Sequence, residues 1–102
     1  MTPKIPDPHA PLRDKVLRTV LDGPGETDPA VRYAAAEGVG MADDLRVLVE
    51  KIHRYAYRVT DEEVAALQAK YGDDRMFEII VSAAVGASRQ RLTAGLRALE
   101  EA

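Results

Sequence analysis

The chain has 102 residues, no cysteine and a formal net charge of −3 at pH 7. This length fits a single domain, the absence of thiols excludes disulfides and thiol chemistry, and the acidic balance argues against general nucleic-acid binding. No apolar run reaches the ~20 residues of a membrane span, and the N-terminus lacks the apolar core of a signal peptide. We therefore expect a soluble, cytoplasmic protein that contacts neither nucleic acid nor membrane.

The N-terminal stretch, residues 1–11, contains four prolines, and we expect it to form an extended arm ahead of a single helical domain at 12–102. The first helix is predicted from Leu12 to about Asp22, because apolar residues recur there at helical spacing. The Gly23-Pro24-Gly25 segment that follows cannot continue a helix and predicts a turn.

Two further helices follow this turn. Asp28 followed by Pro29 is typical of a helix start, and Gly38 predicts the end of that helix. The next apolar repeat, with leucine and valine at i, i+3, i+4 and i+7, predicts a third helix from about Ala42 to Tyr57.

The last two helices are marked by their caps. Thr60 with Glu63 three residues later is a capping box, which predicts a helix from Asp61 to about Tyr71. Asp73 is then expected to cap a fifth and longest helix, from about Asp74 to Glu100. No strand-like alternation occurs, so the predicted fold class is all-α with about five helices and a long central C-terminal helix.

The first half of this longest helix, residues 76–87, is apolar nearly all round, which predicts that other helices surround it. We expect close helix crossings at Ala84 and Gly86, where side chains are small. Sixteen alanines leave few large side chains for the core of a small domain. We therefore predict a homo-oligomer, from dimer to hexamer, in which further apolar surface is buried between chains.

The densest polar and aromatic cluster runs from His53 to Arg58. One interpretation makes it a wall of a ligand pocket, with His53, Tyr57 and Arg58 as catalytic residues and with Arg54 and Tyr55 binding a small acid. The other interpretation is a helix end whose aromatic residues are buried at an interface.

A single Glu50-x-x-His53 pair also lies in this region. A di-iron site needs two such pairs and two further carboxylates, so we predict no metal and no cofactor. The simpler interpretation is a surface ion pair or a histidine that packs between helices.

Four segments together resemble the alkylhydroperoxidase D and carboxymuconolactone decarboxylase-like superfamily: Val-Thr-Asp-Glu-Glu-Val-Ala-Ala-Leu at 59–67, Tyr-Gly-Asp-Asp at 71–74, Met-Phe-Glu-Ile-Ile at 76–80 and Ala-Ala-Val-Gly-Ala at 83–87. The resemblance covers residues 45–99 and implies an all-α fold and an oligomer. Peroxidase members carry a Cys-x-x-Cys pair and a histidine, at positions that fall here near Tyr57, Thr60 and Val64. None of these is Cys or His, so the resemblance implies a cysteine-free member without peroxide-reducing chemistry.

Two functions from different classes follow. The first is an oligomeric, non-redox module that binds a small ligand or a protein. The alternative is a cofactor-free lyase or isomerase of a small carboxylic acid that uses His53, Tyr57 and Arg58. The two interpretations differ in whether these three side chains converge in a cavity.

Overall fold

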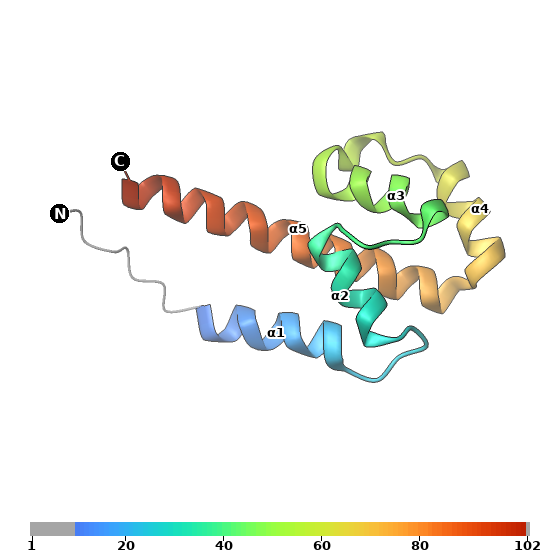
Figure 1. Ribbon diagram of the computed structural model, residues 1–102, viewed down its shortest axis with the longest axis horizontal. Helices are drawn as coiled ribbons and strands as arrows, with labels where there is room; N and C mark the ends of the chain where they lie inside the picture. Colours follow the sequence, from blue (N-terminus) through green and yellow to red (C-terminus); the bar gives the residue numbers. More distant parts are fainter. Residues whose placement is uncertain (1–9, 102) are drawn as a thin grey trace.

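The computed structural model describes residues 10–101, and in this range it contains five α-helices, one short 3₁₀ helix and no strand. Figure 1 shows the longest helix, α5, running through the molecule with the other helices arranged along it. The predicted all-α class is confirmed for the described part of the chain.

The first helix, α1 (Ala10–Asp22), begins two residues earlier than the predicted start at Leu12. Pro11 lies in its first turn, where a missing N–H breaks no hydrogen bond within the helix. Ala10 and Pro11, which the sequence places in a proline-rich arm, are therefore helical. The rest of the predicted arm, 1–9, lies outside the described residues.

The second helix, α2 (Pro29–Glu37), has the predicted limits. The Asp28 side chain caps it by accepting a hydrogen bond from the Ala30 N–H at 2.9 Å. Gly38 ends the helix with a φ of +77°, in the left-handed region where a residue without a Cβ is favoured. Local capping chemistry is sufficient to place both ends.

The third helix, α3 (Asp43–Arg54), is shorter than predicted, and the expected continuation to Tyr57 is wrong. At Tyr55 the backbone leaves the helical region, with φ −142° and ψ 55°, while its N–H still donates to the Lys51 carbonyl. A separate 3₁₀ turn, η1 (Ala56–Arg58), follows. The polar and aromatic cluster therefore does not share one helix face.

The fourth helix, α4 (Asp61–Tyr71), begins at the predicted cap: Thr60 Oγ1 accepts a hydrogen bond from the Glu63 N–H at 3.2 Å. The Glu63 carboxylate in turn accepts a hydrogen bond from Lys51 Nζ at 2.7 Å. The cap is thus linked to α3 by an ion pair, and the start of α4 is held against α3.

The fifth helix, α5 (Asp73–Glu101), has 29 residues and a length of about 43 Å at 1.5 Å per residue. Gly72, with a φ of +88°, separates it from α4. Asp73 is therefore the first residue of the helix and not its cap. Its carboxylate and that of Asp74 lie in the first turn, where the helix dipole favours negative charge.

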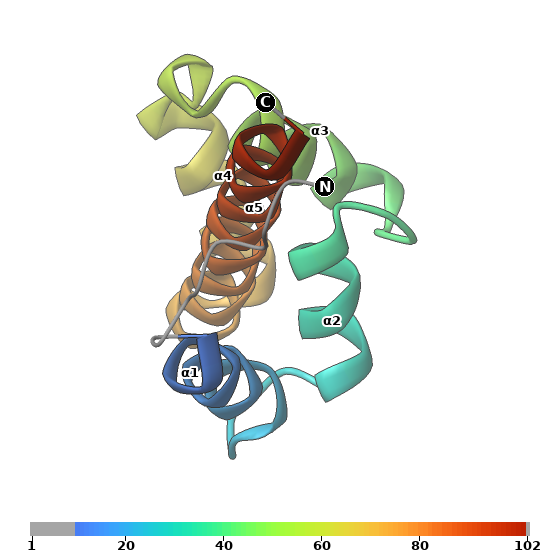
Figure 2. The same ribbon diagram turned by 90° about the vertical axis from the view of Figure 1, so that its left-hand side faces the viewer.

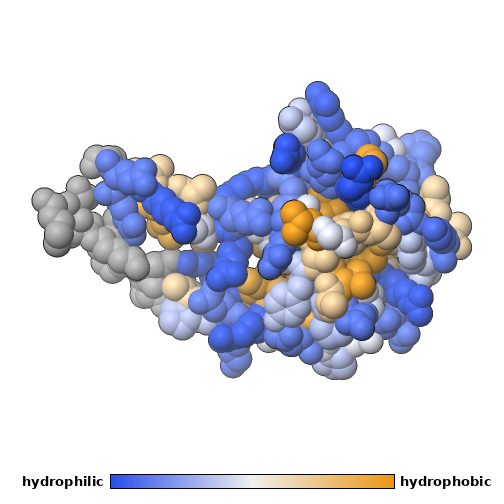
Figure 3. Space-filling view, viewed as in Figure 1, coloured by the Kyte–Doolittle hydropathy of each residue, from blue (hydrophilic) through white to orange (hydrophobic). Residues whose placement is uncertain are grey.

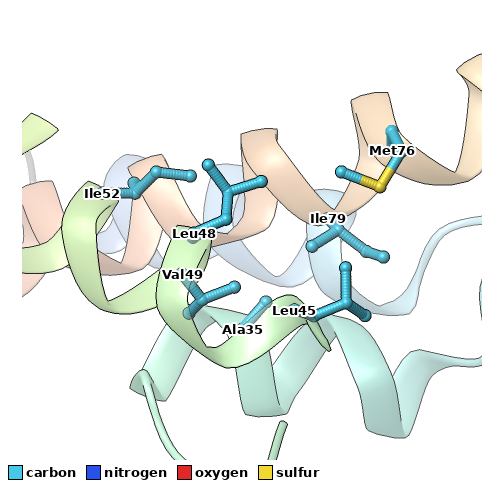
Figure 4. Close-up of a cluster of buried hydrophobic side chains, with 8 residues drawn as sticks. Ala35, Leu45, Leu48, Val49, Ile52, Met76 and Ile79 are labelled. Atoms are coloured by element: carbon cyan, nitrogen blue, oxygen red, sulfur yellow. The ribbon is translucent and has the colours of Figure 1, made fainter. Parts of the chain in front are cut away.

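The core lies on one side of α5. Figure 2, seen close to the axis of α5, shows α1, α2, α3 and α4 arranged around it, and all four contact it. Figure 4 shows the main cluster, which joins α2, α3 and α5. Its buried members are Ala35, Leu45, Leu48, Val49, Ile52, Met76, Ile79 and Ala83. A smaller cluster packs Leu17 and Leu21 of α1 against Ala36 of α2.

The predicted close crossing at Gly86 is confirmed, because a Cβ at this position would overlap the backbone of Ala36 in α2. The same prediction is wrong for Ala84, which is exposed in the single chain. Phe77, which the sequence also places in the surrounded half of α5, is 69% exposed. The four other helices do not enclose α5 completely, so parts of its apolar half stay exposed.

Candidate functional site

His53 lies in the last turn of α3 and is half-buried. Its Nε2 is 2.7 Å from the Ala35 carbonyl oxygen, and because a carbonyl only accepts, this nitrogen carries the proton. Its Nδ1 is 3.3 Å from the side-chain oxygen of Gln90 in α5. The Nε2 hydrogen bond thus joins α3 to α2, and Nδ1 lies beside Gln90 of α5. This is the arrangement of a packing histidine.

Tyr55, Tyr57 and Arg58 form a surface cluster around η1. The Arg58 guanidinium carbon lies 4.9 Å from the Tyr55 ring centre and 5.7 Å from that of Tyr57. The two rings meet edge to face at 6.4 Å. Tyr57 is 80% exposed and Tyr55 45% exposed. The cluster is a solvent-exposed cation–π arrangement and not the wall of an enclosed pocket.

The predicted site residues therefore separate into two groups. A cleft of about 520 Å³ beside His53 is also lined by Arg54 and Glu50, but not by Tyr57 or Arg58. Glu50 is exposed, and among residues 10–101 no three histidine or acidic side chains gather in a group able to hold a metal ion. The convergence of His53, Tyr57 and Arg58 on which the lyase hypothesis depends is not present.

Glu78 is a site residue that the sequence interpretation missed. Its carboxylate accepts hydrogen bonds from the Glu26 N–H at 2.8 Å, the Thr27 N–H at 2.8 Å and the Thr27 hydroxyl at 2.6 Å. The Thr27 hydroxyl contributes most to holding the pKa of Glu78 below its ordinary value. These bonds fix the loop before α2 on α5. The sequence signal for Glu78 is that it is a lone carboxylate within an apolar stretch.

Asp44 at the start of α3 is a second such anchor. Its carboxylate accepts hydrogen bonds from Lys70 Nζ and, at 2.6 Å, from the Tyr71 hydroxyl, both on α4. These bonds, that of Lys70 above all, hold the pKa of Asp44 below its ordinary value. The same carboxylate raises the pKa of Tyr71, since losing the phenolic proton would break that hydrogen bond. Together these contacts fasten the C-terminal end of α4 to α3.

The first of two largely apolar hollows that the sequence did not predict lies beside these anchors. We call it the α2–α5 cleft: a volume of about 520 Å³ between the start of α2, the segment that leads into α3, and the first turns of α5. Its floor is aliphatic and its rim carries charged side chains. In Figure 3, apolar atoms gather on this face over α2 and the segment that follows it.

The second hollow, the α1–α5 groove, has a volume of about 450 Å³. Leu12, Val16 and Leu17 of α1 form one wall, and Ala84, Val85 and Leu92 of α5 form the other. Leu12 is 61% exposed and Val16 50% exposed. Such surface is ordinarily buried, so this groove marks a face that is open in the single chain.

The α1–α5 groove is part of a longer apolar surface on α5. At 3.6 residues per turn, one set of α5 residues lies opposite its buried face, and we call this set the outward stripe. Its members are Phe77, Val81, Ala84, Val85, Ser88, Leu92, Leu96 and Leu99. All of them are exposed or half-buried, and Ser88 is the one polar residue among these eight. At the N-terminal end of α5, the acidic residues Asp74 and Glu78 lie on the same side of the helix as Phe77.

Comparison with known proteins adds no functional assignment. No family model, curated protein or solved structure matches the chain. Among the described residues, no helix combines the length and the apolar character that a bilayer crossing requires.

Proposed function

We propose that this chain is a non-redox helical module that associates with further copies of itself, in assemblies of two to six chains. The observation that carries the proposal is the outward stripe of α5, along which Phe77 is 69% exposed and Leu99 58% exposed. Each Å² of such surface that a second copy covers contributes about 25 cal/mol. The resemblance to the alkylhydroperoxidase D and carboxymuconolactone decarboxylase-like superfamily, whose members are oligomeric, agrees with this assignment.

The occupant that fits the outward stripe is a second α5 in antiparallel orientation. A two-fold axis close to Leu96 sets Leu92 of each copy opposite Leu99 of the other, because the two leucines lie on the same stripe at nearly equal distances from that axis. Leu99 of the second copy then enters the α1–α5 groove, beside Leu12 and Val16. Each chain fills the hollow that the other leaves open.

Charge supports the same orientation. Arg89, which pairs with Asp14 of α1 at 3.4 Å, lies at the inner end of the exposed half of α5. Glu100 lies at its outer end, on the same flank of the outward stripe. In the antiparallel pair Glu100 of one copy comes within two residues of the position opposite Arg89, an axial offset of about 3 Å. A parallel pair would instead place like charges beside each other.

The lyase or isomerase alternative receives no such support. Both ring nitrogens of His53 are in contacts with the protein itself. Tyr57 extends into solvent, and Arg58 stacks on the neighbouring tyrosines. The cleft beside His53 is not lined by Tyr57 or Arg58, so a carboxylic acid bound there would not meet all three groups.

The test is the molar mass in solution of the full chain and of two matched variants. Leu99→Glu places a charge in the outward stripe, whereas Val47→Glu places one on α3 at a residue that is 53% exposed and outside the stripe. Sedimentation equilibrium at micromolar concentration should give two to six times 11.1 kDa for the wild type and for Val47→Glu. Leu99→Glu should give mainly the monomer mass. A monomeric wild type would overturn the proposal, as would an unchanged mass for Leu99→Glu.

A further inference from the structure

The α2–α5 cleft has the form of a small-molecule site. It shares no lining residue with the α1–α5 groove, so self-association through that groove leaves it accessible. Its volume of about 520 Å³ is in the range of ligand pockets. Its floor is aliphatic and consists of Val31, Ala34, Met41, Leu45 and Ile79. A ligand here buries a hydrocarbon group.

The rim of the cleft carries both signs of charge. Arg75 of α5 lines it, is exposed, and forms no ion pair within residues 10–101. Asp28 and Glu26, which precede α2, also line it. One oxygen of Asp28 accepts the capping hydrogen bond from Ala30, which leaves the other oxygen for a ligand. A cation and two carboxylates thus border one apolar floor.

We propose that the α2–α5 cleft binds a small zwitterion with a hydrocarbon side chain, that is, an apolar α-amino acid such as leucine. The carboxylate of the ligand pairs with Arg75, its ammonium group pairs with Asp28 and Glu26, and its side chain covers the aliphatic floor. The guanidinium fork of Arg75 suits a carboxylate, because it can donate two parallel hydrogen bonds.

Other ligand classes match the rim less well. The carboxylate of a fatty acid would pair with Arg75, but its negative charge would lie beside the carboxylates of Asp28 and Glu26. The ammonium group of a hydrophobic amine would pair with the two carboxylates, but it would be repelled by the positive charge of Arg75. A sugar would leave the aliphatic floor without an apolar partner. Only a ligand with both charges and an apolar group complements every part of the cleft.

Calorimetric titration of the full chain with L-leucine tests the proposal. Two analogues serve as probes of the charges: 4-methylpentanoate lacks the ammonium group, and 3-methylbutylamine lacks the carboxylate. We expect saturable binding of leucine, and at least tenfold weaker binding of each analogue. Equal binding of either analogue would overturn the zwitterion assignment, and no binding of leucine at millimolar concentration would overturn the site.

Three variants locate the binding. Arg75→Gln and Asp28→Asn should each weaken leucine binding at least tenfold, and asparagine keeps the cap of α2 because it is as good an N-cap residue as aspartate. Arg97→Gln, on α5 outside the cleft, should bind as the wild type does. Wild-type affinity in Arg75→Gln or Asp28→Asn would overturn the placement. The readout is independent of the molar mass, so failure of this proposal and failure of self-association are distinguishable.

Discussion

Single residues connect segments that lie far apart in the sequence. Glu78 receives three hydrogen bonds from Glu26 and Thr27, and Asp44 receives those of Lys70 and Tyr71. In both cases a carboxylate on one helix holds the end of another helix or loop. Hydrogen bonds to a charged acceptor are stronger than those between neutral groups. Such carboxylates can therefore hold two segments together even at an exposed position.

The Glu78 contacts predict a specific pH dependence of stability. The folded-state pKa of Glu78 lies below its unfolded value. Its carboxylate therefore stabilises the fold above the unfolded pKa, and this stabilisation is lost as the pH falls through the folded pKa. Urea unfolding of Glu78→Gln should show a lower free energy of unfolding than the wild type at neutral pH, and the difference should shrink as the pH falls below the ordinary pKa of a glutamate.

Glu62→Gln is the matched control for this measurement, because Glu62 is an exposed carboxylate in the first turn of α4. It should follow the wild type more closely across the same pH range. If Glu78→Gln kept the full pH dependence of the wild type, the hydrogen bonds from Thr27 would not be the source of the shift.

At the scale of the elements, α2 and α5 approach closely where Gly86 meets Ala36. A glycine inside a helix costs about 1 kcal/mol relative to alanine. At Gly86 that cost is offset by the crossing, since even a methyl group would overlap the α2 backbone. Gly95 lies in the same helix, and a Cβ there meets nothing within 4 Å. A comparison of the two glycines therefore separates the effect of helix propensity on stability from the effect of packing.

Gly86→Ala and Gly95→Ala should therefore shift stability in opposite directions. We expect Gly86→Ala to lower the free energy of unfolding by roughly 1–3 kcal/mol through overpacking. Gly95→Ala should raise it by up to about 1 kcal/mol. Urea unfolding in a Leu99→Glu background keeps the chains apart during both measurements. A stabilising Gly86→Ala would contradict the close crossing of α2 and α5.

The whole molecule is asymmetric about α5. The described residues extend 53 × 29 × 20 Å, and each of the four shorter helices contacts α5. Figure 1 shows that beyond α1 and α3 the C-terminal end of α5 continues without another helix alongside. The outward stripe and the α1–α5 groove are thus open in the single chain, and we propose that a second copy covers them.

If the folded chain binds copies of itself and the unfolded chain does not, stability depends on concentration. We expect the thermal midpoint of the wild type to rise by several degrees when the chain concentration increases from about 1 to 100 μM, because mass action favours the assembled, folded state. Leu99→Glu should show a midpoint nearly independent of concentration. Circular dichroism at both concentrations measures this, and a constant wild-type midpoint would argue against assembly.

Much of the fold was predictable because helix ends are local. Asp28-Pro29, Gly38, the Thr60 and Glu63 cap and Gly72 place the ends of α2 and α4 from chemistry within a few residues. The end of α3 was not predictable in this way. The apolar and aromatic residues at 55–57 continue a helical pattern, but the backbone leaves the helix at Tyr55. The 3₁₀ turn that follows has no capping signature in the sequence.

The sequence by itself determined the all-α class, most helix limits and the close approach at Gly86, since each follows from propensity, capping or side-chain size. Only the tertiary structure decided which side of α5 is covered, that His53 packs against Ala35 and Gln90, and that Arg75 shares a cleft with Asp28. These facts join residues separated by 18 to 47 positions, and they depend on the directions in which the helices cross. Periodicity along one helix shows which residues share a face, but the neighbour of that face is set by the packing of the whole chain.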